Sequence, residues 1–195
     1  CSTLIADGFI TPAISISSAV EGINNIYPDL PVIPIIVGII MILFAVQQFG
    51  TAAIGKFFGP FMVVWFSFLG YLGAIQIIDN PSVLRALNPW WAINLITNID
   101  GGFWILGSVF LCTTGAEALY SDLGHCGKGN IRVSWAFVAT LLVMNYMGQA
   151  ALCLTPGFSL AESQTVFYSM VPESIMPFAI AIATAATIIA SQALI

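Results

Sequence analysis

The chain has 195 residues, of which 59% are hydrophobic and only 7% are charged. Soluble domains carry about 25% charged residues, so this composition excludes an ordinary water-exposed surface and predicts a polytopic membrane protein. The net charge of −5 speaks against nucleic acid as a partner, because no basic patch is present to neutralise phosphates.

Six apolar segments are candidates for membrane-spanning helices, which need about 20 residues each. We expect them at residues 4–24, 32–49, 59–78, 102–121, 133–154 and 174–195. The apolar runs are continuous rather than alternating, which is not the pattern of a membrane barrel. The sequence therefore predicts an all-α protein with a single transmembrane domain over residues 1–195. Because both ends of the sequence fall in apolar segments, we expect an internal part of a longer protein.

Basic residues predict how these segments are oriented. Lys56 lies between the second and third segments, and Lys128 and Arg132 lie between the fourth and fifth. These two connections fall on one side if all six segments span, whereas the opposite connections hold only Arg85. By the positive-inside bias, we expect the side of Lys56 and Lys128 to be cytoplasmic.

The two outer connections, residues 80–100 and 155–174, are longer and rich in aromatic residues. We expect loops here, with Trp90, Trp91 and Tyr168 placed in the interfacial aromatic belt.

The first segment carries polar residues along one stripe of a helix, because their spacing is i, i+4, i+11 and i+14. These residues are Asp7, Thr11, Ser18 and Glu21, with Ser15 beside them. Pro12 has no backbone donor and disfavours a helical conformation at Thr11. We therefore expect a loop or an irregular start at Asp7-Gly8.

The fourth segment has a similar face, formed by Thr113, Glu117 and Tyr120 at i, i+4 and i+7. Gly115 adds backbone freedom for local unwinding. A charge at the membrane centre costs about 2.5–3.5 kcal/mol, and such residues usually face a wet interior and mark ion pathways or proton relays. An alternative remains open: Glu117 and Glu21 both lie near the ends of their segments, where a carboxylate is often simply solvated.

The remaining polar residues predict structural roles. Thr184, Thr187 and Ser191 align at i, i+3 and i+7 among alanines, which favours close helix packing with hydroxyls bonding across helices. Asn145 and Gln149 are expected to hydrogen-bond between helices. His125 and Cys126 are adjacent in a polar loop and do not by themselves form a metal site.

Five phrases of the sequence are distinctive when read in series: CSTLIADGFITPAISISSAVEG, QQFGTAAIGKFFGPFMVVWF, TGAEALYSDLGHCGKGNIRVSW, MNYMGQAAL and ATIIASQALI. In their order and spacing they resemble the KUP/HAK/KT family of potassium uptake permeases. The resemblance covers essentially the whole chain.

This resemblance implies part of a larger transporter with the inverted repeat of the LeuT/APC type, with the six segments as helices three to eight. In that fold, ion and substrate sites form at broken helices, and the fourth segment would be the broken helix six. The membrane-embedded carboxylates of the family map onto Glu21 and Glu117. The family's helix-one motif, with a further aspartate, is not in this sequence, so the chain would hold only part of the site.

The implied function is secondary active potassium uptake across the plasma membrane, coupled to protons as a potassium–proton symport. The expected ion-binding or proton-coupling residues are Glu117, Glu21, Asp7, Thr11, Thr113 and Tyr120. Protein oxygens can replace the water shell of potassium, and burial raises the pKa of a carboxyl group. No cofactor is expected besides the transported potassium and proton. The expected partners are these ions, the lipid bilayer and the rest of the same transporter chain, with a homodimer left open.

Two other functions remain as alternatives: a passive cation channel, and an APC-type transporter of an organic solute. An enzyme is not expected, because the sequence has no HExxH, GxSxG or P-loop motif.

Overall fold

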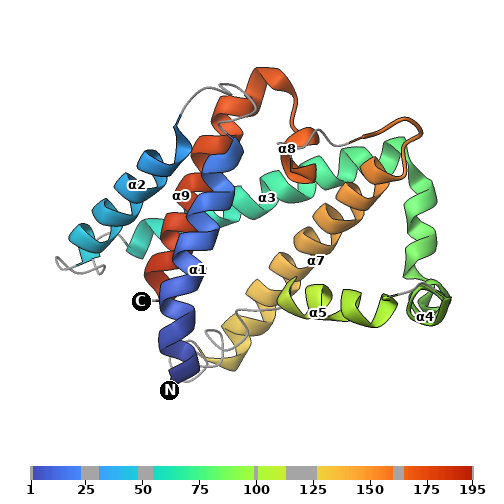
Figure 1. The fold of residues 1–195 in the computed structure, drawn as a ribbon, viewed down its shortest axis with the longest axis horizontal. Helices are drawn as coiled ribbons and strands as arrows, with labels where there is room; N and C mark the ends of the chain where they lie inside the picture. Colours follow the sequence, from blue (N-terminus) through green and yellow to red (C-terminus); the bar gives the residue numbers. More distant parts are fainter. Residues whose placement is uncertain are drawn as a thin grey trace.

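The computed structural model describes residues 2–22, 31–47, 55–98, 101–112, 127–159 and 165–194. Every regular element within these ranges is helical, which agrees with the predicted all-α class (Figure 1). The elements are α1 (Ser2–Glu21), α2 (Val32–Gln47), α3 (Gly55–Asp79), η2 (Pro81–Leu87), α4 (Pro89–Asn98), α5 (Gly102–Cys112), α7 (Lys128–Cys153), α8 (Val166–Ser169), η3 (Glu173–Ile175) and α9 (Met176–Leu194).

Three stretches of helix in the described part of the chain are long and apolar enough to cross a membrane: Phe57–Asp79, Lys128–Cys153 and Glu173–Ser191. A shorter apolar helix covers Val32–Ala45. Large apolar side chains on these and other helices remain exposed, among them Phe57 at 74% and Trp104 at 80%. Such surfaces fit contact with lipid or with further helices, so the protein is a polytopic membrane protein.

Helix α1 continues through Asp7-Gly8 without interruption. The expected loop at that position was therefore wrong. Pro12 lies inside the helix and is buried, and α1 packs against both α9 and α2. Proline is tolerated within membrane helices when neighbouring helices surround it, so packing outweighs the local preference against helix.

The outer connections also contain more structure than expected. Residues 80–100, predicted as a loop, hold η2 and α4. The start of α4 has a local cause: the Asn88 side chain accepts a hydrogen bond from the backbone N–H of Trp90 at 3.0 Å, and Pro89 occupies the first helical position, where its missing donor costs nothing. The second connection holds α8 and η3.

Helices α3 and α7 form a parallel pair that converges toward the carboxyl ends, at the right of Figure 1. A Cβ atom added to Gly70 would lie 2.3 Å from the Leu141 side chain, and one added to Gly148 would lie 2.4 Å from the Cα of Gly73. Further along, Asn80 Nδ2 donates to the carbonyl of Ala151 at 3.2 Å. Both helices therefore begin at the same end of the pair.

This parallel packing agrees with the predicted sidedness of the basic residues. Lys56 is in the first turn of α3, and Lys128 and Arg132 are in the first turns of α7. Arg85 belongs to η2, which contacts the pair at its opposite end.

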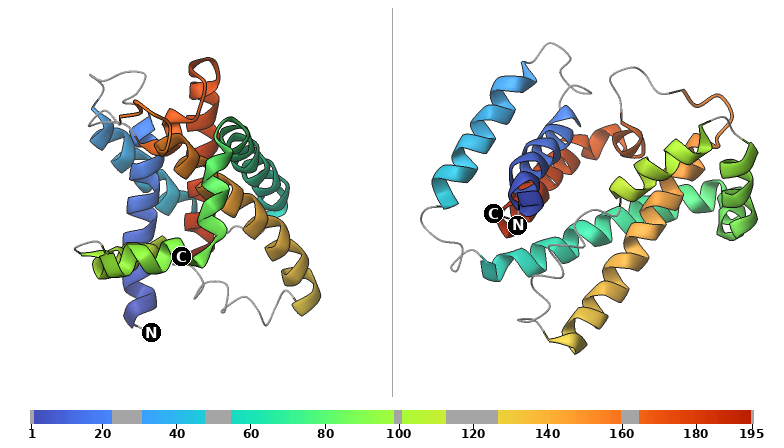
Figure 2. Two further views of the ribbon diagram at one scale, coloured as in Figure 1. Left: turned by 90° about the vertical axis from the view of Figure 1, so that its right-hand side faces the viewer. Right: turned by 60° about the horizontal axis from the view of Figure 1, so that its bottom comes forward.

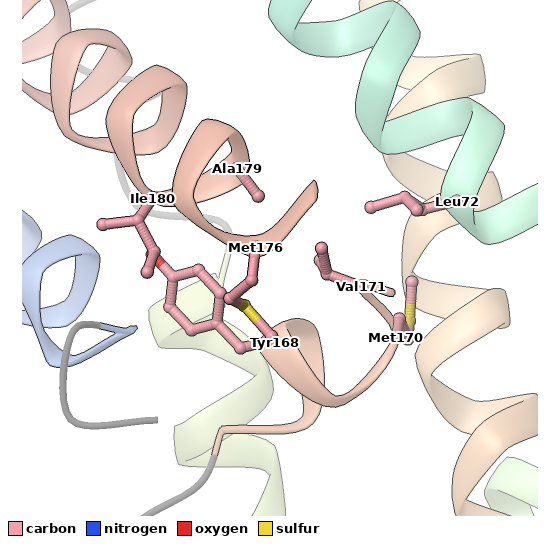
Figure 3. Close-up of a cluster of buried hydrophobic side chains, with 7 residues drawn as sticks. All are labelled: Leu72, Tyr168, Met170, Val171, Met176, Ala179 and Ile180. Atoms are coloured by element: carbon pink, nitrogen blue, oxygen red, sulfur yellow. The ribbon is translucent and has the colours of Figure 1, made fainter. Parts of the chain in front are cut away.

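Helices α1 and α9 run side by side in opposite directions, so that the start of α1 and the end of α9 lie at the same end of this pair in Figures 1 and 2. Helix α2 packs on this pair through a cluster of Ile16, Val20 and Leu43, with Ile188 against it. A second cluster joins α3, α9 and the segment around α8 (Figure 3), and consists of Leu72, Tyr168, Met170, Val171, Met176, Ala179 and Ile180.

Candidate functional site: a hydroxyl-lined cavity

A cavity of about 620 Å³ lies where α1, α3, α7, α8 and α9 come together. We call it the hydroxyl-lined cavity, because six of its lining residues carry hydroxyl groups. Its lining consists of Ile14, Ser15, Ser18, Ala19, Trp65, Tyr146, Thr165, Phe167, Tyr168, Ala183 and Thr187. None of these residues is charged, so the described part of the wall offers neutral oxygen atoms among apolar and aromatic groups.

The hydroxyl groups of this wall differ in how they are used. Thr187 Oγ1 donates to the carbonyl of Thr184 at 2.8 Å, which leaves its lone pairs as acceptors. Thr165 Oγ1 is buried and has no hydrogen-bond partner among the described residues. A buried hydroxyl without a partner is costly and calls for an explanation. Oxygen atoms of this kind can replace the water shell of a weakly hydrated cation.

The polar stripe predicted for the first segment is in part on this wall. Ser15 and Ser18 line the cavity. Asp7, Thr11 and Glu21 belong to the same helix, and Thr11 is one turn before Ser15 on that face. The side chains of these three residues are not described, so their predicted roles remain predictions.

The other predicted site residues, Thr113, Glu117 and Tyr120, lie outside the described residues, as do His125 and Cys126. The described part of α5 ends at Cys112. The predicted unwinding of this helix remains a prediction as well.

Sequence reasoning missed Thr165 and misplaced Tyr168. Tyr168 is only 3% exposed, and its hydroxyl donates to the carbonyl of Ala19 at 2.7 Å. The expected place in an interfacial belt was therefore wrong. No local sequence pattern predicts this burial, because Ala19, the hydrogen-bond partner of Tyr168, is 149 residues away in the sequence.

Two sets of hydrogen bonds that were predicted between helices form within one helix in the structure. Gln149 Nε2 donates to Asn145 Oδ1 at 3.1 Å within α7, rather than to another helix, although Asn145 is 4% exposed and lies against Gly73. On α9, the hydroxyl of Thr184 bonds back to Ile180 of its own helix at 2.8 Å. Short side chains reach the preceding turn more easily than a neighbouring helix.

The model of one family, described as the K+ potassium transporter integral membrane domain, matches residues 1–195. The chain belongs to this family.

Curated relatives agree with this family. The chain is 52% identical to the "Probable potassium transport system protein Kup" of Flavobacterium psychrophilum and 54% identical to the protein of the same description from Flavobacterium johnsoniae. It is 48% identical to the "Putative potassium transport system protein Kup 1" of Lactococcus lactis subsp. cremoris. Each match covers 100% of this chain but only 30% or 31% of the relative. The chain thus spans about 30% of the length of these potassium transport proteins. No solved structure matches it.

Proposed function

We propose that this chain forms part of a secondary active potassium transporter of the plasma membrane, which couples potassium uptake to protons as a symport. The observation that carries the proposal is the hydroxyl-lined cavity, placed among helices that are apolar enough to span a membrane. Membership of the potassium transporter family supports potassium as the transported ion. The LeuT-type inverted repeat is proposed for the complete protein on the resemblance of the sequence.

In this proposal the cavity supplies neutral oxygen ligands. Ser15, Thr165 and Thr187 come from three different segments of the chain and border one space. Potassium can exchange its hydration shell for such oxygens. Thr11 would extend this set along α1. The carbonyls that the predicted unwinding at residues 113–116 would free, with Thr113 and Tyr120, would complete it.

Carboxylates would supply the charge and the proton. Glu117 and Glu21 are the candidates for this role, with Asp7 along the same face of α1 as Thr11. A carboxyl group removed from water has a raised pKa, which lets it bind and release a proton during transport near neutral pH. A passive channel would need no such group, so proton coupling separates the two functions.

The test uses a complete transporter of the length of the relatives, carrying these 195 residues, in cells deficient in potassium uptake. Rubidium uptake and the accompanying proton influx are measured at low external potassium over a range of pH. We expect Glu117→Gln and Glu21→Gln to reduce uptake about tenfold or more, because interactions with charged groups contribute about 1.5–3 kcal/mol.

Glu173→Gln is the matched control, because Glu173 is an exposed carboxylate in η3 that does not border the cavity. It should transport normally. Full uptake with an unchanged pH dependence in Glu117→Gln would exclude the proton role, and rubidium conduction without proton influx in the unmodified protein would favour the passive channel.

A further inference from the structure

Tyr168 contacts the carboxyl end of α1 in two ways. Its hydroxyl donates to the carbonyl of Ala19 at 2.7 Å in a buried position. Its ring lies flush against Gly22, where an added Cβ atom would be 2.5–2.8 Å from three ring carbons. Only a residue without a side chain fits there while the ring stays in place.

Tyr168 also packs against α9 and against a neighbouring aromatic ring. Met176 and Ile180 of α9 belong to the same buried cluster, and Figure 3 shows their side chains beside the ring. The ring of Phe167 meets it edge to face, with centroids 5.1 Å apart. Tyr168 therefore packs against α9 and its own segment in addition to its contacts with α1.

The hydrogen bond has a specific consequence for α1. The last four carbonyls of a helix have no N–H partner within the helix, and α1 ends at Glu21. The carbonyl of Ala19 belongs to this last turn, and the Tyr168 hydroxyl donates a hydrogen bond to it. A side chain from the segment around α8 is thus hydrogen-bonded to the last turn of α1.

The last turn of α1, which Tyr168 contacts, also forms part of the cavity. Ser18 and Ala19 line it, and Glu21 lies between Ala19 and Gly22, the two positions that Tyr168 contacts. Thr165, three residues before Tyr168, lines the same cavity from a different segment of the chain. A shift of Tyr168 would therefore change the spacing between two walls of the hydroxyl-lined cavity.

From this geometry we propose that Tyr168 is a positioning residue for transport: it fixes the last turn of α1, and with it Ser18 and Glu21, relative to α8 and α9. This inference rests on the proposed function. The alternative is that Tyr168 only fills the core, and the two roles give different measurements. A core role changes the amount of folded protein, whereas a positioning role changes the affinity for the ion and the pH profile.

The experiment compares Tyr168→Phe with Tyr71→Phe in the complete transporter. Tyr168→Phe keeps the ring and removes the donor to Ala19. Tyr71 is 63% exposed on α3 and does not line the cavity, so Tyr71→Phe should behave like the unmodified protein. We expect Tyr168→Phe to raise the half-saturating rubidium concentration by about two- to tenfold, the range for one hydrogen bond, and to shift the pH profile of uptake.

Gly22→Ala tests the same contact from the side of α1. Its new Cβ atom must displace the Tyr168 ring, so the same two quantities should change. Half-saturation and pH profile do not depend on how much protein reaches the membrane, so both variants remain decisive at reduced expression.

The outcomes separate this inference from the proposed function. If the unmodified transporter takes up rubidium with proton influx and both variants keep its half-saturation and pH profile, the positioning role is wrong and the proposed function stands. If the unmodified transporter shows no rubidium uptake, the proposed function fails, and the inference fails with it.

Discussion

The contact of α3 with α7 and the contact of α1 with α8 and α9 hold helices together by different means. In the first, glycines bring backbone against backbone, as an added Cβ on Gly73 would lie 2.3 Å from the carbonyl oxygen of Met144. In the second, side chains leave a cavity of about 620 Å³ with hydroxyls on its wall. Small residues allow close packing in lipid, whereas a space with oxygen atoms is suited to a ligand. The contact of α3 with α7 is therefore suited to close packing, whereas the contact of α1 with α8 and α9 borders a cavity.

The strongest test of this comparison is Gly73→Ala. Its Cβ atom would meet backbone atoms of Met144 and Asn145 that cannot move aside alone. Overpacking of this kind costs typically about 1–3 kcal/mol, so we expect a clear fall in the thermal stability of the detergent-solubilised transporter. Gly59→Ala, on the same helix with nothing within 4 Å of its added Cβ, is the control. Equal melting temperatures for the two variants would contradict the close contact.

Thr165→Val should have a smaller effect than Gly73→Ala, and we expect it on ion affinity rather than on stability. Replacing a buried hydroxyl that has no partner in the described part of the chain by a methyl group costs the fold little or nothing, so stability should be kept. If the oxygen is a ligand for potassium, the half-saturating rubidium concentration should rise about two- to tenfold.

The control for Thr165→Val is Thr140→Val, at an exposed position on α7 whose hydroxyl bonds to Ala136 of its own helix at 2.8 Å. It should leave affinity unchanged. A Thr165→Val transporter with unchanged affinity would remove Thr165 from the ion site.

The smallest effect is expected for Asn88→Ala, which lies in neither region. It removes the side-chain acceptor for the N–H of Trp90 at the start of α4. Loss of such a cap costs about 0.5–2 kcal/mol, confined to an exposed helix. Hydrogen exchange at the first turn of α4 should accelerate while rubidium uptake stays normal, and protection unchanged from the unmodified protein would show that the cap contributes nothing.

The two regions also differ in how far their structure could be predicted from the sequence. Helices α3, α7 and α9 follow from continuous apolar runs, because a span needs little information beyond length and composition. Helix α4 was missed because its signal is the Asn88-Pro89 cap, which marks a helix start and not a span. The cavity wall depends on contacts such as Tyr168 with Ala19, which are distant in sequence and leave no periodic trace.

The position of the α1 serines could be predicted from the sequence only in part. Helical periodicity placed Ser15 and Ser18 close to one face, and both line the cavity. Periodicity could not say what stands opposite them, since Thr165 and Thr187 come from segments more than a hundred residues later. Pro12 was misread for a related reason, because its local preference gave way to the helices packed around it.

The approach of Gly148 to Gly73 limits how the bundle can rearrange. With peptide groups in direct contact and no side chain between them, neither helix can turn about its own axis or slide past the other without first separating from it. Helices α3 and α7 should consequently travel as a single rigid body at this crossing. Any conformational change around a bound ion would then occur at contacts between longer side chains. Such side chains can change rotamer while the two backbones stay in place.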